Sequence, residues 1–205
     1  ARAGLDIVAV RAPAHPVACA LLDAFGGPLV APSANRSGRP SPTTLADALE
    51  ETGGAAAAAL DGGPCAIGLE STVVALLDEA RLLRPGAVTR AEVEALIGPL
   101  SEAQADAKRS PGRLTRHYAP DLPLRLNAEE PRADEVWLGF GRKGGAGFNL
   151  SPDGDLTEAA ANLFAYLRLA DHSHGAAGLA VAPIPDVGLG EAINYRLRRA
   201  AGYVG

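Results

Sequence analysis

The polar residues best able to do chemistry gather in one short segment, residues 32–43 with the sequence PSANRSGRPSPT. Their hydroxyls and amide are donors and acceptors that can be oriented towards a ligand. The segment connects an apolar stretch to a predicted helix start, where open α/β sheets place their ligands and where free backbone N–H groups favour an anion. An ordinary turn with a helix cap is the alternative, because turns use the same residues.

Two further stretches place polar groups next to predicted strands. In residues 68–74, GLESTVV, a glycine and an acid precede two hydroxyls, so Ser71 or Thr72 would lie at the mouth of a sheet. Arg84 ends another predicted strand directly before a Pro-Gly turn, where a guanidinium can hold a phosphate through paired hydrogen bonds. A solvated arginine is the simpler interpretation of Arg84, and each pattern alone is weak.

No residue is predicted to be a nucleophile, an acid–base catalyst or a metal ligand. Ser33 lacks the GxSxG turn of a hydrolase. His172 and His174 have no third ligand at metal-binding spacing, so a solvated loop is the better interpretation. The GxGxxG match at 139–144 is not followed by a helix start, which argues against a dinucleotide site. Any chemistry would therefore rest on binding and aligning reactants.

Capping and helix-breaking residues predict the elements that must position these groups. Thr89 and Glu92 have the spacing of a capping box, and an early proline with a closing Gly-Gly delimits a helix before residue 26. The predicted helices span 15–25, 41–51, 89–97, 157–170 and 189–201, and the predicted strands span 5–10, 28–31, 57–60, 71–77, 81–84, 135–140 and 179–182. The alternation of strands and helices after residue 121 favours parallel pairing.

A polar stretch containing proline and glycine divides the chain into two units. We expect a domain over 1–100, a linker over 101–120 and a second domain over 121–205. Residues 1–100 hold 7 basic and 11 acidic side chains, a net charge of −4. Residues 101–120 hold 4 and 2, a net charge of +2, and residues 121–205 hold 8 and 11, a net charge of −3. This acidic balance argues against a broad surface for duplex nucleic acid but not against a nucleotide.

Composition narrows the class of protein. With 47% hydrophobic and 21% charged residues, the 205-residue chain is typical of globular domains. No apolar run approaches the roughly 20 residues of a membrane span. The two cysteines, Cys19 and Cys65, form no CxxC pair, which fits a reducing, cytoplasmic location.

Four motifs, taken in order, resemble the Sua5/YrdC/YciO family and, within it, the two-domain Sua5 type. They are PSAN…SGRPSPT at 32–43, GLESTVV at 68–74, LRPG at 83–86, and SPG…HYAP across 110–120. The resemblance covers the whole chain, with a Sua5-specific domain from residue 121. It implies the fold class α/β: a YrdC-like twisted-sheet domain lacking its N-terminal part, followed by a small Rossmann-like parallel α/β domain.

The resemblance also implies a reaction. L-threonine, bicarbonate or CO2, and ATP with Mg²⁺ would give threonylcarbamoyl-AMP and pyrophosphate, mainly through alignment and charge neutralisation. The product is the donor for N6-threonylcarbamoyladenosine in tRNA, so a downstream tRNA threonylcarbamoyl transferase is an expected partner, with at most a weak contact with RNA and none with a membrane. The implied threonine-binding residues are Arg11, Ser33 and Ser71, and the implied ATP-binding residues are Asn35, Ser41, Arg84 and Tyr118.

The sequence departs from the family pattern at one point. Such catalytic domains begin with a longer part whose Lys-x-Arg element holds ATP phosphates, whereas no lysine occurs here before Lys108. We therefore expect the chain to lack the N-terminal half of that domain and to be inactive alone.

The net-basic linker is expected to act either as a lid or only as a tether. In a lid, polyphosphate would be attracted by Arg109, Arg113 and Arg116, and Tyr118 would contact the nucleotide. Replacing Tyr118 by alanine would then lower turnover with little loss of fold stability. Two other functions stay open: a noncatalytic nucleotide- or RNA-binding member of the same fold, and a carbamoyl-transfer relative.

Overall fold

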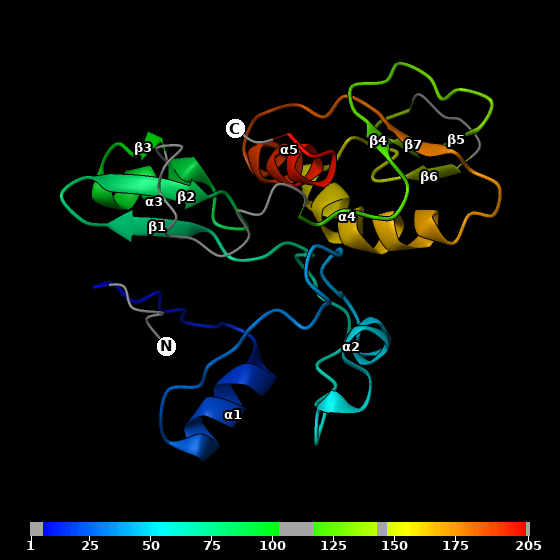
Figure 1. The fold of residues 1–205 in the computed structure, drawn as a ribbon. Coiled ribbons are helices and arrows are strands. Elements are labelled where there is room, and N and C mark those ends of the chain that lie inside the picture. Colours follow the sequence, from blue (N-terminus) through cyan, green and yellow to red (C-terminus); the bar gives the residue numbers. More distant parts are fainter. Residues whose placement is uncertain (1–5, 103–116, 143–146, 204–205) are drawn as a thin grey trace.

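The computed structural model describes residues 6–102, 117–142 and 147–203 and is an α/β structure with two sheets (Figure 1). Its elements are, in order, α1 (Pro16–Phe25), α2 (Leu45–Thr52), the 3-10 turn η1 (Gly53–Ala55), β1 (Val73–Leu76), β2 (Ala80–Arg84), α3 (Arg90–Ile97), β3 (Ser101–Glu102), β4 (Leu124–Arg125), β5 (Glu135–Gly139), β6 (Gly147–Asn149), α4 (Leu156–Asp171), β7 (Gly178–Val181) and α5 (Leu189–Ala200). The predicted fold class is confirmed, and all five predicted helices are present, although α2 begins at Leu45 and not at residue 41.

The first sheet is mixed and has the order β1-β2-β3. β1 pairs antiparallel with β2, and β3 pairs parallel with β2. The helix α3 joins β2 to β3, and it begins at the predicted capping box of Thr89 and Glu92. The first two residues of the predicted linker, Ser101 and Glu102, thus belong to this sheet, while its residues 103–116 lie outside the described part of the chain.

The second sheet has the order β4-β7-β5-β6, and all its neighbouring strands are parallel. Alternate residues of β7 face opposite sides, as the pleat of a strand requires. Leu179 and Val181 pack into the main core, to which α4 contributes Leu163 and Phe164. Ala180 packs with Trp137 on the other face. The main core therefore lies between this sheet and the helices α4 and α5.

Three predicted strands are wrong: the described residues within 5–10, 28–31 and 57–60 have no strand structure. An apolar, extended segment becomes a strand only when its backbone N–H and C=O groups find a neighbouring strand, and none of the strands in the described ranges pairs with these segments. Their side chains are accordingly exposed, with Val10 at 90% and Val30 at 82%.

The helix α5 lies between the first sheet and α4, and it contacts both α3 and α4 (Figure 1). Its Glu191 accepts a 2.8 Å hydrogen bond from Arg90 at the start of α3. Among the helices of the described residues, none is both long and apolar enough to span a membrane.

Candidate functional site

The polar segment 32–43 forms a loop that is folded back on itself and joined to the distant chain. The Asn35 amide donates to two carbonyl oxygens within the loop, at 2.9 and 3.2 Å. The Gly38 carbonyl accepts a 2.8 Å hydrogen bond from the backbone N–H of Ala119. The loop ends at a capping box in which Thr44 and Asp47 start α2. The segment therefore combines the predicted helix cap with a contact to the HYAP motif.

Glu70, in the GLESTVV stretch, lies at the centre of the site. Its carboxylate accepts a hydrogen bond from the Ser41 hydroxyl and another, 2.8 Å long, from Nε of Arg196. The side chain of Arg196 comes from α5 and is completely buried. The same guanidinium donates to the backbone carbonyls of Glu70 at 3.0 Å and of Pro85 at 2.7 Å. One arginine of the C-terminal unit thus holds two motif-bearing loops.

The charge of Glu70 follows from these contacts. Burial raises the pKa of its carboxyl, but the charge of Arg196 and the hydrogen bonds from Ser41 and Arg196 outweigh burial, so the pKa is lowered. Glu70 is therefore ionised at neutral pH and can only accept hydrogen bonds. Because the Ser41 proton points at Glu70, the lone pairs of the Ser41 oxygen are left to accept from another donor.

Arg84 lies at the end of β2, beside the same loops. Its Nε donates to the Ser71 carbonyl at 3.1 Å. The ion pairs formed within the described ranges do not include Arg84. The following turn comes very close to the GLESTVV stretch, since a Cβ on Gly86 would lie 2.4 Å from the backbone nitrogen of Thr72. Glycine is required there by this close approach.

Tyr118 is part of the core and not a surface group of a lid. It is 1% exposed, and its ring lies 5.5 Å from that of Phe164 and 5.8 Å from the Arg196 guanidinium. Burial, with a further contribution from the charge of Glu70, raises the pKa of its hydroxyl. That buried hydroxyl forms no hydrogen bond of normal geometry with a described residue, although the nearby Arg84 side chain lowers its pKa against the larger effect of burial. The expectation that its removal would hardly affect stability is therefore wrong, because Tyr118 packs with core residues.

The other residues proposed for the lid, Arg109, Arg113 and Arg116, lie outside the described residues. His117, which precedes Tyr118, lies within the described residues, and no role was predicted for it from the sequence. Its ring meets the Tyr118 ring edge-on at 4.0 Å. Its pKa is lowered by burial and by the charges of nearby arginines, including Arg199, against the opposing effect of Glu70. The neutral imidazole is thus the favoured form beside this site.

Apart from Asn35, whose amide is held within its own loop, the predicted site residues separate into two groups in the structure. Ser41, Ser71, Arg84 and Tyr118 lie around Glu70 and Arg196 through the contacts given above. Arg11 and Ser33 are exposed, and neither side chain forms a hydrogen bond or ion pair with another described residue.

Two residues of the site were not predicted from the sequence, Glu70 and Arg196. The signal of Arg196 is visible in the helix pattern, because this residue is one helical turn from Ala192 and from Ala200, both of which are buried. A charged residue on the apolar face of a helix is rarely buried unless it has a partner. The sequence could thus have indicated a buried ion pair, but not its partner Glu70.

A second ion-pair group holds the polar loop against the C-terminal unit. The side chain of Glu51, in α2, is fully buried and accepts from Arg168 of α4 at 2.9 Å and from Arg36 at 3.1 Å. Burial raises the pKa of Glu51, but the hydrogen bonds from Arg36 and Arg168 outweigh it and hold the pKa at about 2. The packing is also tight, since a Cβ on Gly68 would lie 2.5 Å from the Ala160 carbonyl of α4.

Comparison with known proteins gives consistent matches over the whole chain. A family model described as "Telomere recombination" (Sua5_yciO_yrdC) matches residues 1–86, and one described as "Threonylcarbamoyl-AMP synthase, C-terminal domain" (Sua5_C) matches residues 88–202. The "Threonylcarbamoyl-AMP synthase" of Bacillus subtilis is 37% identical over 98% of this chain and 64% of its own length. The protein of the same name from Pyrococcus abyssi is 38% identical, over 98% and 65%.

Solved structures agree with this similarity. The crystal structure of Pyrococcus abyssi Sua5 complexed with L-threonine matches with a TM-score of 0.87 and 35% identity, over 98% of this chain and 65% of that chain. The chain therefore spans a little less than two thirds of the length of these relatives.

Proposed function

Because the chain belongs to the Sua5 family of threonylcarbamoyl-AMP synthases, whose C-terminal domain model covers residues 88–202, we propose that it serves the synthesis of threonylcarbamoyl-AMP. The substrates would be L-threonine, bicarbonate or CO2, and ATP, and the product would be the donor for N6-threonylcarbamoyladenosine in tRNA. The observation that supports this proposal is the convergence of Ser41, Glu70 and Arg84, from three separate motifs, on a site closed by Arg196.

On the nucleotide side, the proposal assigns Asn35, Ser41, Arg84 and Tyr118 to ATP. Arg84 offers a guanidinium that no carboxylate of the described residues neutralises, which suits a phosphate. Tyr118 offers a hydroxyl that is kept protonated by its raised pKa, so it can act as a hydrogen-bond donor. Both groups are held on the protein before any ligand arrives, which lowers the cost of aligning the nucleotide.

On the threonine side, the proposal assigns Arg11, Ser33 and Ser71. The exposed guanidinium of Arg11 is available to clamp the threonine carboxylate in a bidentate pair. Arg11→Ala should then weaken threonine binding about tenfold to a hundredfold, the range for a hydrogen bond to a charged group, while ATP affinity changes much less. Equal losses for both ligands in calorimetry would assign Arg11 a structural role.

The proposed chemistry needs little proton transfer by the protein. The threonine amine forms a carbamate, whose oxygen attacks the α-phosphorus of ATP and displaces pyrophosphate. The chain would align the carbamate with the phosphorus and neutralise developing charge. Mg²⁺ would enter bound to the phosphates of ATP, since the described residues contain no group of three or more potential metal ligands.

The test uses a chimera. The N-terminal part of the Bacillus subtilis relative that this chain does not cover is joined ahead of residue 1, and pyrophosphate release from ATP is measured with and without threonine. We expect release that requires threonine from the chimera and none from the 205-residue chain alone. A folded chimera that releases no pyrophosphate, or releases it without threonine, would refute the proposed synthase.

The alternative function is that of a noncatalytic nucleotide- or RNA-binding member of the same fold, which the chimera would reveal by binding ATP without releasing pyrophosphate. The proposal also covers the location of the protein in the cell and its partner. Free cysteines at Cys19 and Cys65 support a cytoplasmic location. A tRNA threonylcarbamoyl transferase would be the downstream partner.

A further inference from the structure

A second hollow lies in the C-terminal unit, on the other side of α5 from the Glu70 site. Arg196 and Arg198 are two residues apart and so project about 200° apart around the helix. Arg196 reaches Glu70, whereas Arg198 lines a cavity of about 520 Å³. None of the residues that surround this cavity has a role in the proposed synthase.

The position of the cavity in the fold is one that favours ligands. β4 and β7 are neighbouring parallel strands, and the cavity lies at their carboxyl ends. Leu126 and Asn127 directly follow β4, and Ala182 directly follows β7. In open parallel sheets, the crevice beyond the carboxyl ends of the strands is where small molecules bind.

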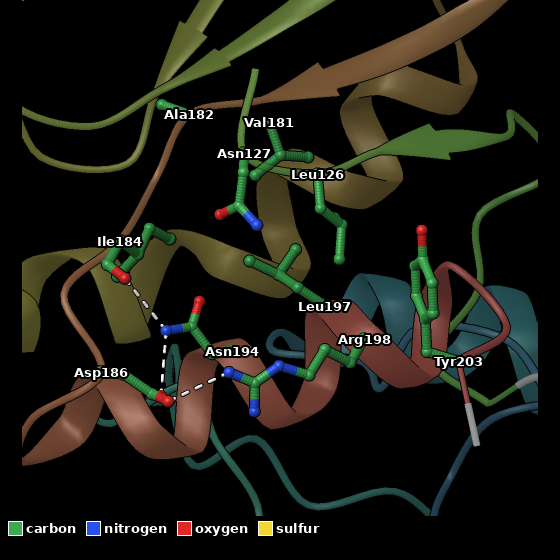
Figure 2. Close-up of a pocket in the computed structure, with 10 residues that line it drawn as sticks. All are labelled: Leu126, Asn127, Val181, Ala182, Ile184, Asp186, Asn194, Leu197, Arg198 and Tyr203. Atoms are coloured by element: carbon green, nitrogen blue, oxygen red, sulfur yellow. Dashed lines mark hydrogen bonds and ion pairs between the residues drawn. The ribbon is translucent and has the colours of Figure 1, made fainter. Parts of the chain in front are cut away.

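The walls of the cavity combine an apolar floor with a polar rim, as in small-molecule sites generally. Val181, Ile184 and Leu197 form the floor and are almost completely covered, so the surface open to a ligand comes mainly from the exposed Asn127 and Tyr203. Figure 2 shows the amides of Asn127 and Asn194 facing one another across the hollow, with the Tyr203 ring at one end.

The charges of the rim cancel. Arg198 donates to Asp186 at 3.0 Å, so the one basic and the one acidic side chain of the lining neutralise each other. The Asn194 amide nitrogen donates to the Ile184 carbonyl at 3.0 Å and to Asp186 at 3.1 Å, which orients its amide oxygen as an acceptor. A neutral rim with oriented amides suits an uncharged polar ring better than a phosphate.

The Asn127 side chain is exposed at the cavity. Its backbone has φ 54°, a left-handed conformation that asparagine adopts more readily than most other non-glycine residues. The Asn127 side chain forms no hydrogen bond to another described residue, so both its donor and its acceptor are available.

We propose that this cavity binds an adenine base, with its ring stacked on Tyr203 and its polar edge on the Asn127 amide. An asparagine amide pairs in a bidentate manner with N6 and N7 of adenine, because it offers one donor and one acceptor at the matching spacing. An aromatic ring such as that of Tyr203 stacks on a base. The base can come from a free nucleoside or from an unpaired adenosine in RNA, and the proposal does not depend on the synthase activity.

The experiment is a calorimetric titration of the chain with adenosine. Asn127→Gly keeps the backbone conformation and removes the amide, and it should weaken binding about five- to tenfold. Tyr203→Ala should weaken it by at least about fivefold. Glu129→Ala, an exposed change on the same loop, is the matched control and should have no effect. Tyr118→Phe changes a proposed nucleotide contact at the other site, so it separates this cavity from the proposed ATP site and should not weaken adenosine binding here.

Three results would overturn the proposal: no saturable binding of adenosine, binding that is weakened by Tyr118→Phe but kept with Asn127→Gly, or displacement of adenosine by inorganic phosphate. A second titration with a six-nucleotide oligoadenosine identifies the source of the base. Tighter, salt-dependent binding of the oligonucleotide supports the cavity as an RNA site, because phosphate contacts add a salt-dependent contribution. Equal affinity for both ligands supports it as a nucleoside site.

Discussion

Arg196 offers the most direct test of how the two units are joined. Its fully buried side chain pairs with Glu70, whose side chain is 20% exposed, and it also satisfies the carbonyls of Glu70 and Pro85. Arg196→Ala would leave a largely buried carboxylate without its cation and two carbonyl groups without donors. Breaking a buried pair in this way costs about 3–5 kcal/mol of stability. Because Glu70 is partly exposed, we expect Arg196→Ala to lower the free energy of unfolding by about 3 kcal/mol.

The matched control lies two residues away on the same helix. Arg198 pairs with Asp186, but both side chains are 53% exposed, so water competes for the pair. Arg198→Ala should therefore cost only about 0–1 kcal/mol. The difference between the two variants measures the buried ion pair together with the carbonyl hydrogen bonds of Arg196, since residue type and helix are the same.

The assay is urea unfolding followed by circular dichroism, with a double-mutant cycle. Glu70→Gln alone leaves Arg196 buried and unpaired, whereas the double variant Arg196→Ala/Glu70→Gln removes both charges. The double variant should be destabilised by clearly less than the sum of the single changes, because charges in contact couple. Equal effects of Arg196→Ala and Arg198→Ala, or additive effects in the cycle, would refute the reasoning.

Three further predictions concern single residues. The pKa of Glu51 is about 2 in the folded state, against an ordinary 4.5. Its ionised form therefore stabilises the fold fully above pH 4.5, and this stabilisation is lost as the pH falls towards 2. Glu51→Gln should accordingly lose less stability on acidification than the unchanged protein, as measured by urea unfolding. Gly68→Ala, with φ 69° and a clash against α4, should lower the thermal midpoint by several degrees more than Gly63→Ala, with φ 76° and open space; equal shifts would contradict the tight packing. Tyr118→Phe should leave urea stability nearly unchanged and, in the chimera, weaken ATP binding about two- to tenfold; unchanged binding would remove Tyr118 from the ATP site.

The helices were predictable because their signals are local. Thr89 and Glu92 start α3 by hydrogen bonds that span three residues, and the short stretch between Thr44 and Asp47 does the same for α2. The strands were less predictable. Residues 28–31 and 73–76 are both apolar and extended in type, but only the second segment has a partner strand in the described structure. Pairing depends on what lies beside a segment, which its own sequence does not contain.

The sequence by itself determined the family, through four motifs in a fixed order, and most of the polar groups of the site. Only the tertiary structure decided which of them meet. Arg196 and Glu70 are 126 residues apart, and Arg168 and Glu51 are 117 apart. The helices α4 and α5 bring these arginines to the motif loops because their apolar faces pack on the second sheet and leave the arginines facing the first unit. Contacts across such separations follow from the packing of whole elements, and no local pattern specifies them.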